Sequence, residues 1–198
     1  MTRLLRAAWR IVFCVALLAS VIAVPAEASP TRRADPVAQR AGLAVTEARS
    51  LRAKGKRVWC VPFARTLSGL EIKGNAKTWW AAAAGRYRRG DEPEVGAVMV
   101  FSGSRKMPMG HVAVVAQVVS ERVILVDHAN WKRNQVSLGM AVTDVSDAGD
   151  WSAVRVEGTP GVAGRVNPVS GFIYPDNAEP PVRKSRHARA VEERVASR

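Results

Sequence analysis

The sequence predicts an α+β fold in which a cysteine-bearing helix packs on an antiparallel β-sheet. Apolar residues first recur at helical spacing, at Phe63, Leu67 and Leu70. Further along the chain, the valine-rich runs 111–119 and 122–128 are typical of strands. Apolar residues make up 47% and charged residues 24% of the 198 residues, a balance that excludes a wholly disordered or fibrous protein.

Two helices are expected before the strands. We expect the first to begin at Cys60, because Pro62 would fall in the first turn, where a missing N–H is tolerated. It should end near Gly69. The second is predicted over residues 76–84 and should end at Gly85.

The predicted strands come from the second half of the chain. They cover residues 97–101, 111–119, 122–128 and 170–174, and a polar turn is predicted over 86–93. A tight turn at Ser120 and Glu121 would join two of them as a hairpin. Residues 132–169 show no clear pattern and lead to no prediction.

Four segments are expected along the chain. Residues 1–28 have the features of a secretory signal peptide: three arginines, an apolar run and an A-x-A cleavage site. The run is about 14 residues long, short of the roughly 20 that span a bilayer. Residues 29–57 are interpreted as a basic linker with one possible short helix, 58–176 as the folded domain and 177–198 as a basic disordered tail. We therefore expect a secreted or periplasmic protein.

The charge of the chain is concentrated in its flanks. The formal net charge is +13, yet residues 58–179 carry 13 basic and 12 acidic side chains. The sequence offers no nucleic-acid recognition element, so we expect no specific binding to nucleic acid. The basic flanks either make weak, salt-sensitive contacts with anionic envelope polymers or simply keep the protein soluble. We expect a monomer.

Export would leave Cys60 as the only cysteine of the mature chain, because Cys14 lies within the signal segment. An unpaired cysteine is either buried and inert or reactive. A position at the start of a helix favours the reactive interpretation, because the helix dipole stabilises a thiolate and lowers the thiol pKa. A thiolate nucleophile works best beside a histidine that accepts and returns a proton.

His111, which follows Gly110 at the start of a predicted strand, is the candidate base. A two-residue turn in the hairpin would place His111 opposite Asn130 and on the same face as His128, with Asp127 on the other face. A three-residue loop would reverse this and favour Asp127. On the first register, His128 or Asn130 would orient the imidazole.

Zinc binding is the alternative use of these side chains. Cys60, His111 and His128 are the only plausible ligand set, but the sequence lacks a closely spaced ligand pair. We expect no metal and no cofactor. Trp59 and Trp131 flank the proposed site, where they would either line a substrate groove or pack against the fold.

Five stretches, taken in order, resemble the CHAP domain (cysteine, histidine-dependent amidohydrolase/peptidase). They are 59–65, 74–79, 93–101, 110–115 and 126–131. Members of this family are papain-like hydrolases, and many cut peptidoglycan. The resemblance therefore implies a papain-like fold and cleavage of amide or peptide bonds in peptidoglycan or its stem peptides.

The resemblance also implies roles for individual residues. Cys60 matches the nucleophile and His111 the general base. The third catalytic position, commonly acidic or amide in this family, falls on His128, a residue type that is usual there in related cell-wall peptidases. Asn130 matches a recurrent asparagine before Trp131 and is an alternative orienting residue.

Three other functions stay open at this point. The first is a CHAP-like module that binds the cell wall without cleaving it. The second is an envelope structural protein whose basic tails bridge anionic polymers, and the third is an amidase that acts on a soluble small molecule. The first two do not need the Cys60 thiol for their function, whereas the third is also an enzyme and differs from the hydrolase in its substrate.

Overall fold

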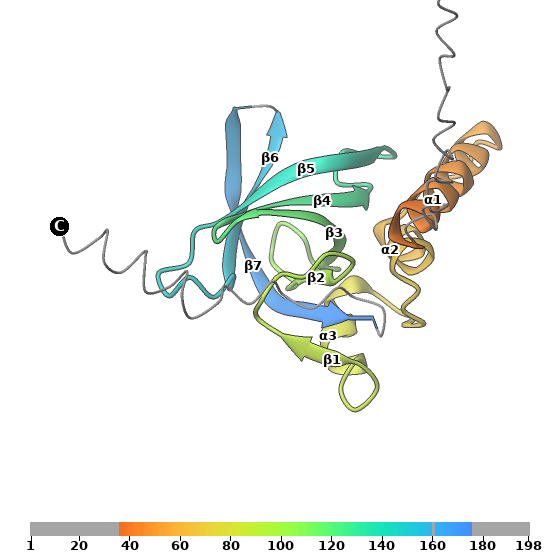
Figure 1. Ribbon diagram of the computed structural model, residues 1–198. Helices are drawn as coiled ribbons and strands as arrows, with labels where there is room; N and C mark the ends of the chain where they lie inside the picture. Colours follow the sequence, from red (N-terminus) through yellow and green to blue (C-terminus); the bar gives the residue numbers. More distant parts are fainter. Residues whose placement is uncertain (1–35, 160, 176–198) are drawn as a thin grey trace, which may run out of the picture. The chain divides into compact units, whose positions relative to one another are not determined.

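The computed structural model describes residues 36–159 and 161–175, which form an α+β fold with helices first and strands after them, as predicted (Figure 1). The predicted signal peptide, 1–28, and basic tail, 177–198, lie outside the described residues. The elements are α1 (Pro36–Ala53), α2 (Cys60–Ser68), the 3-10 helix η1 (Ala76–Thr78), α3 (Trp79–Ala82), β1 (Arg88–Gly90), β2 (Val98–Phe101), β3 (His111–Ser120), β4 (Val123–Ala129), β5 (Val136–Asp144), β6 (Ala153–Thr159) and β7 (Val162–Tyr174).

The strands form one antiparallel sheet that closes on itself. Its order is β1-β7-β2-β3-β4-β5-β6, and β7 also pairs with β6. The closure is possible because β7 is long: its first part pairs with β6, and its last part pairs with β2 and β1. In Figure 1, β7 accordingly runs from the β6 hairpin to the neighbourhood of β1 and β2.

Two buried clusters occupy the two faces of this sheet. Val98, Val100, Val112 and Val114 pack with the helices. Their neighbours along β2 and β3 belong to a second cluster, which includes Met99, Phe101, Ala113, Val115 and Trp151. The alternation follows from the two-residue period of a strand. It determines which side chains of β3 and β4 share a face at the candidate site.

Helix α2 forms as the sequence predicts. Phe63 and Leu67 are buried against the sheet, at the helical spacing that the pattern indicated. Gly69 ends the helix with a φ of 79°, and its N–H donates to the carbonyl of Arg65 at 2.8 Å. A positive φ favours glycine at this position. Cys60 is the first residue of the helix.

Helix α1 differs from the predicted linker. Instead of one short surface helix, 18 residues form a helix beside α2 (Figure 1). Ala44 and Ala48 are buried at the contact, and the Arg40 guanidinium donates to the Ser68 carbonyl at 3.1 Å. Small alanines let the two helices approach but give a weak hydrophobic pattern. The domain therefore begins before residue 58.

The β3–β4 hairpin reaches the predicted register by a different route. Ser120 pairs with Val123, so the turn residues are Glu121 and Arg122 rather than Ser120 and Glu121. Two bulges in β3 then shift the register, and Val114 pairs with Asp127. This pairing is the one that the expected turn implied. The bulges therefore compensate for the displaced turn before the chain reaches His111.

Much of the sheet lies in sequence that led to no prediction. Strand β5, β6 and the first part of β7 occupy the unpatterned region, and β1 occupies the predicted polar turn. The side chains of β5 do not alternate cleanly between buried and exposed: Leu138 is 56% exposed and Gly139 has a φ of 61°. In β6, by contrast, Val154 and Val156 are buried at alternate positions and belong to the second cluster.

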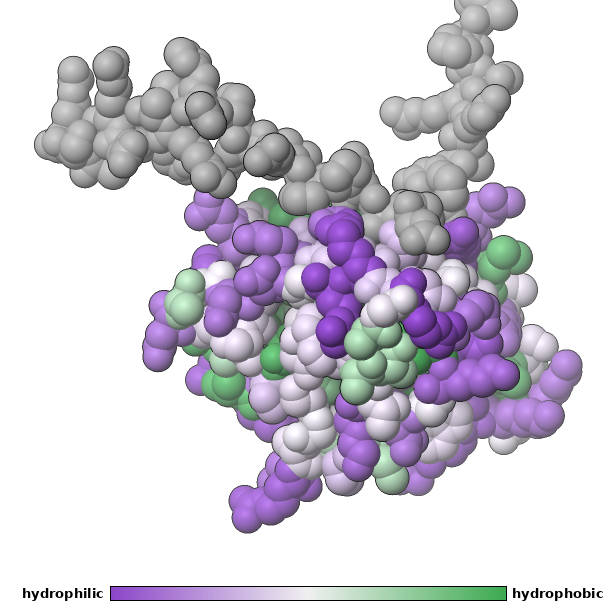
Figure 2. Space-filling model, turned by 90° about the horizontal axis from the view of Figure 1, so that it is seen from below, coloured by the Kyte–Doolittle hydropathy of each residue, from purple (hydrophilic) through white to green (hydrophobic). Residues whose placement is uncertain are grey.

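Figure 2 presents one face of the described surface. Hydrophilic side chains cover most of that face, and the hydrophobic areas are small and separate. Scattered exposed apolar residues of this kind need no binding partner to explain them. Within the described residues, none of the helices combines the length and apolar character needed to cross a membrane.

Candidate active site

The thiol of Cys60 lies at the start of α2, where backbone N–H groups surround it. The N–H groups of Cys60, Val61 and Val112 lie near its sulfur and favour the thiolate. The first two belong to the opening turn of the helix, which has no carbonyl partner for them. Pro62, the next residue, has no N–H. Val112 is the second residue of β3, so the cysteine meets the sheet one position from His111.

The structure corrects the predicted ionisation of this thiol. Burial raises the pKa of Cys60 above its ordinary value, and the three backbone N–H groups lower it by less. A helix start favours the thiolate, but the loss of water around the sulfur disfavours it and has the larger effect. At neutral pH the resting side chain is therefore a neutral thiol.

The two candidate histidines are in direct contact. His111 Nε2 and His128 Nδ1 are 3.0 Å apart, and the two residues are 4% and 0% exposed. Of the three groups considered for the third position, it is His128 that the fold brings to His111. Asp127 points elsewhere, because its Oδ1 accepts from the N–H of Gly139 at 2.7 Å, as its predicted place on the other face requires.

Within residues 36–159 and 161–175, neither imidazole has a carboxylate as a hydrogen-bond or ion-pair partner. Burial lowers the pKa of His111 well below its usual value, and the nearby His128 lowers it further. Burial lowers the pKa of His128 to about 4. Each shift has the sign expected for a base removed from water without a counter-ion. Both rings are neutral at neutral pH.

Aromatic rings enclose the histidine pair. The Trp131 ring is 5.1 Å from that of His111 and 5.6 Å from that of His128, measured between ring centroids. Phe101 packs edge-on against His111 at 5.6 Å. This enclosure keeps water away from the imidazoles and fixes their planes. Trp131 therefore contacts the histidines, whereas Trp59 is 48% exposed, with the Arg57 guanidinium 4.2 Å above its ring.

Asn130 lies in a different place from the one expected of an orienting residue. Its Oδ1 accepts from the Asn134 N–H at 2.8 Å, and Asn134 Oδ1 accepts from the Val58 N–H at 2.9 Å. The two asparagines, with φ of 63° and 57°, thus tie the turn after β4 to the segment just before Cys60. Sequence reasoning missed Asn134, although asparagine is enriched at positive φ.

Gly110 fixes the entry into β3, as its position before His111 suggested. Its φ is 69°, and a Cβ there would lie 2.7 Å from both the Lys77 nitrogen and the Phe101 carbonyl oxygen. The Lys77 N–H also donates to the Met109 carbonyl at 2.9 Å. The backbone of η1 therefore packs directly on the residue before His111, and a side chain at position 110 would push them apart.

Two missing hydrogen bonds and one further contact define what the site can do. Among the described residues, no hydrogen bond joins Cys60 to His111, and His111 Nδ1 has no hydrogen-bond partner. His128 Nε2 lies 3.2 Å from the Met140 sulfur, a contact for which the sequence offered no signal. In the same part of the chain, no cluster of three or more His, Cys, Asp or Glu side chains is arranged to hold a metal ion.

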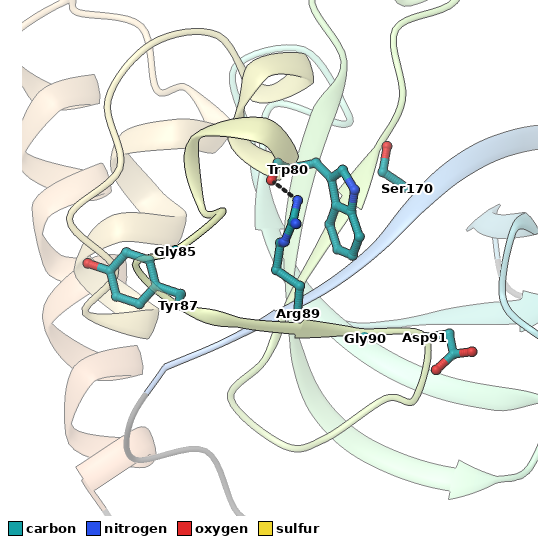
Figure 3. Close-up of a pocket in the computed structure, with 7 residues that line it drawn as sticks. All are labelled: Trp80, Gly85, Tyr87, Arg89, Gly90, Asp91 and Ser170. Carbon is teal, nitrogen blue, oxygen red and sulfur yellow. Dashed lines mark hydrogen bonds between the residues drawn. The ribbon is translucent and has the colours of Figure 1, made fainter.

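A separate pocket of about 570 Å³ is lined from α3, β1 and their surroundings, and none of its lining residues is one of the predicted site residues (Figure 3). Arg89 donates to the Trp80 carbonyl at 2.7 Å, and its guanidinium lies 4.7 Å from the centre of the Trp80 ring. Figure 3 shows these two side chains next to each other. The Arg89 guanidinium therefore covers part of one face of the Trp80 ring.

Comparison with known proteins adds the family. No curated protein matches the chain. Residues 52–130 match the CHAP domain, a stretch that contains Trp59, Cys60, His111, His128 and Asn130. At the family level, this domain implies amidase- or peptidase-type hydrolysis of peptidoglycan. The resemblance found in the sequence is confirmed over residues 52–130, the stretch that matches the CHAP domain.

Proposed function

We propose that this protein is an exported cysteine hydrolase that cleaves an amide or peptide bond of peptidoglycan through a thioacyl-enzyme. Cys60 would be the nucleophile, His111 the base and His128 the residue that orients His111. One observation carries the assignment: His111 Nε2 is held 3.0 Å from His128 Nδ1, which leaves Nδ1 of His111 as the ring nitrogen available for a thiol proton.

The placement of the cysteine supports a papain-like arrangement. Cys60 opens a helix that packs on an antiparallel sheet, and its sulfur lies near the N–H of Val112, the residue after His111. Proton transfer requires the thiol to move toward Nδ1, and we expect this to happen when substrate binds, because catalytic hydrogen bonds often tighten only then. The family match over residues 52–130 supports the same class of chemistry.

In the first half of the reaction, the S–H bond of Cys60 breaks and its proton goes to His111 Nδ1 while the sulfur attacks the scissile carbonyl carbon. The tetrahedral oxyanion would accept a hydrogen bond from the Cys60 N–H, which lies at the free start of α2. The proton on His111 then passes to the leaving nitrogen as the C–N bond breaks. The product is a thioester and a free amine.

In the second half, water attacks the thioester carbonyl while His111 Nδ1 takes its proton. Collapse of the tetrahedral intermediate breaks the C–S bond, and the Cys60 sulfur recovers a proton from His111. The products are a carboxylic acid and the resting enzyme, so the proton and atom count closes. Throughout both halves, His128 Nδ1 keeps its hydrogen bond to His111 Nε2.

The neutral resting state affects how the first step runs. With the thiol pKa raised and the His111 pKa lowered, a preformed thiolate–imidazolium pair is disfavoured. Proton transfer and carbon–sulfur bond formation then proceed together, with His111 acting as a general base. This differs from the thiolate that a helix start suggests by itself.

Substrate contact and location complete the proposal. Trp59, beside the nucleophile and about half exposed, would stack on the substrate, while Trp131 keeps the histidines in place. The sequence of residues 1–28 supports export to the envelope, where peptidoglycan lies. The basic flanks would add weak attraction to anionic envelope polymers.

The test compares the wild-type chain with Cys60→Ala on purified peptidoglycan. We expect clearing in a zymogram by the wild type and none by the variant, with circular dichroism showing that both are folded. Mass spectrometry of the released fragments then identifies the bond that is cut. Failure of the folded wild type to release any fragment would contradict hydrolysis and favour a non-cleaving cell-wall binder.

A further inference from the structure

The thioether of Met140 occupies an unusual position for a methionine. Met140 pairs with Val126 across β4 and β5, and its sulfur lies 3.2 Å from His128 Nε2. A thioether sulfur accepts hydrogen bonds weakly and donates none. The contact is therefore a hydrogen bond only if His128 carries its proton on Nε2.

This assignment determines the proton positions of both rings. A neutral imidazole carries one proton, so a proton on Nε2 leaves His128 Nδ1 as an acceptor. The group that faces it, His111 Nε2 at 3.0 Å, must then be the donor. A neutral His111 with its proton on Nε2 has an unprotonated Nδ1. That is the state that a base for Cys60 requires.

We propose that Met140 is a positioning residue, which holds His128 in the Nε2–H tautomer and through it keeps Nδ1 of His111 free of a proton. The effect of Met140 on catalysis rests on the hydrolase function proposed above, whereas its effect on the tautomers of the two histidines does not depend on that function. Met140 acts through His128 and does not touch the reacting atoms.

The opposite proton arrangement explains why an acceptor is needed. If His128 carried its proton on Nδ1, it would donate to His111 Nε2, and a neutral His111 would then hold its proton on Nδ1. The base position facing the thiol would be blocked. The 3.0 Å contact between the rings is compatible with both arrangements, so it does not select between them. The contact between His128 Nε2 and the Met140 sulfur selects the arrangement in which His128 carries its proton on Nε2.

The charge state of the pair supports the same chain of hydrogen bonds. The two residues are 4% and 0% exposed, and burial keeps both rings neutral at neutral pH, so a single tautomer of each ring has to satisfy the contacts. An unsatisfied N–H in such a place is costly. Removing the sulfur takes away the preference for the Nε2–H tautomer, so the opposite arrangement, whose unpartnered N–H lies at His111 Nδ1, also becomes populated.

The experiment measures tautomers and turnover on the full chain. Ring-nitrogen chemical shifts from ¹⁵N NMR at neutral pH distinguish a protonated from an unprotonated nitrogen in each histidine. Met140→Leu removes the acceptor at similar volume, Met140→Gln restores one through its amide oxygen, and Met99→Leu is the matched control. Met99 is fully buried on β2, and among the described residues no hydrogen bond joins it to either histidine.

We expect wild type and Met99→Leu to show Nε2–H in both His111 and His128. Met140→Leu should populate Nδ1–H in both rings, and Met140→Gln should return them toward Nε2–H. Fixing a catalytic imidazole in the wrong tautomer costs up to about 10⁴ in kcat, so a partial shift should lower kcat on peptidoglycan by roughly 10- to 100-fold with KM little changed.

Two results would overturn the proposal. One is a wild-type spectrum with Nδ1–H in His128, which requires no variant and so does not depend on how Met140→Leu folds. The other is a folded Met140→Leu protein whose ring-nitrogen shifts equal those of the wild type. Absence of hydrolysis by the wild type would instead contradict the proposed function, while the tautomer measurement on the resting protein would still decide the role of Met140.

Discussion

Buried polar side chains are held in two different ways in two regions of this sheet. At the end of β5, Asp144 is 3% exposed and forms an ion pair with Arg122 at 2.9 Å, with further hydrogen bonds from Ser146. At the candidate site, His111 and His128 are equally buried but face each other and a thioether.

The difference shows what decides the charge of a buried group. A counter-ion and several donors make a buried charge tolerable, whereas two imidazoles without a carboxylate respond to burial by losing their protons. The first region stabilises the hairpin turn through Arg122. The second is a neutral chain of hydrogen bonds in which the position of a proton, and not a fixed charge, prepares the base.

The largest expected effect comes from removing the base itself. His111→Asn should lower kcat on peptidoglycan by at least about 10³-fold, because the variant lacks the group proposed to take the thiol proton. Thermal unfolding of the variant checks that the fold persists. Retention of more than a tenth of wild-type turnover by a folded His111→Asn protein would remove His111 from the mechanism.

Acid should destabilise the site region in a defined pH window. The folded protein keeps His128 neutral down to a pKa of about 4, while the unfolded chain binds this proton near 6.5, so protonation favours unfolding as the pH falls. The stability present above pH 6.5 should fall by roughly 3 kcal/mol between pH 6.5 and 4 from this residue alone. The burial of His111 adds a contribution of the same sign.

Urea unfolding at pH 7 and at pH 4.5 measures this loss. His128→Gln, which has no group that titrates in that range, should show a smaller pH dependence than the wild type. Equal pH dependence in the two proteins would mean that His128 titrates normally and that its neutrality is not imposed by the fold.

Removing the ion pair between Arg122 and Asp144 should lower the stability of the protein and leave its turnover unchanged. Arg122→Ala leaves the Asp144 carboxylate buried without its cation, and we expect a loss of roughly 2 kcal/mol in the free energy of unfolding, moderated because Arg122 is itself half exposed. Arg105→Ala, at an exposed position, is the control. Below the melting temperature, turnover per folded molecule should equal that of the wild type. A tenfold drop would show that the two regions are coupled.

Supplying the site with a carboxylate should make it resemble the other region. In His128→Glu, a carboxylate beside His111 should stabilise its imidazolium and raise the His111 pKa by about one unit or more relative to the wild type. NMR titration of the ring protons follows this directly, because only His111 and His187 remain. An unchanged pKa would indicate that burial alone, whatever the partner, controls this imidazole.

The sequence predicts the parts of the molecule that depend on local pattern. Helix α2 and Cys60 at its start follow from apolar spacing and Gly69, and the pairing of His111 with His128 follows from strand periodicity. The register was right for a reason that the sequence does not reveal, since two bulges offset the displaced turn. Bulges depend on sheet twist, which a linear pattern does not encode.

The rest depends on what surrounds each group once the chain is folded. The ionisation of Cys60 was wrong because desolvation is a property of the packed site. Asn130 was placed beside His111 by counting along the strand, but it follows the end of β4 and turns toward Asn134. Met140 lies in a strand without a clear pattern, and β5 brings it to His128 through pairing alone.

The charge of the Cys60 thiol is the most direct test of this account. With Cys14→Ala, which leaves Cys60 as the only thiol, the rate of alkylation by iodoacetamide is measured from pH 4 to 11. A buried neutral thiol predicts a rate that is low at neutral pH and rises through a pKa above the ordinary cysteine value. A fast, pH-independent rate from pH 4 to 8 would instead reveal a preformed thiolate–imidazolium pair and contradict the neutral site.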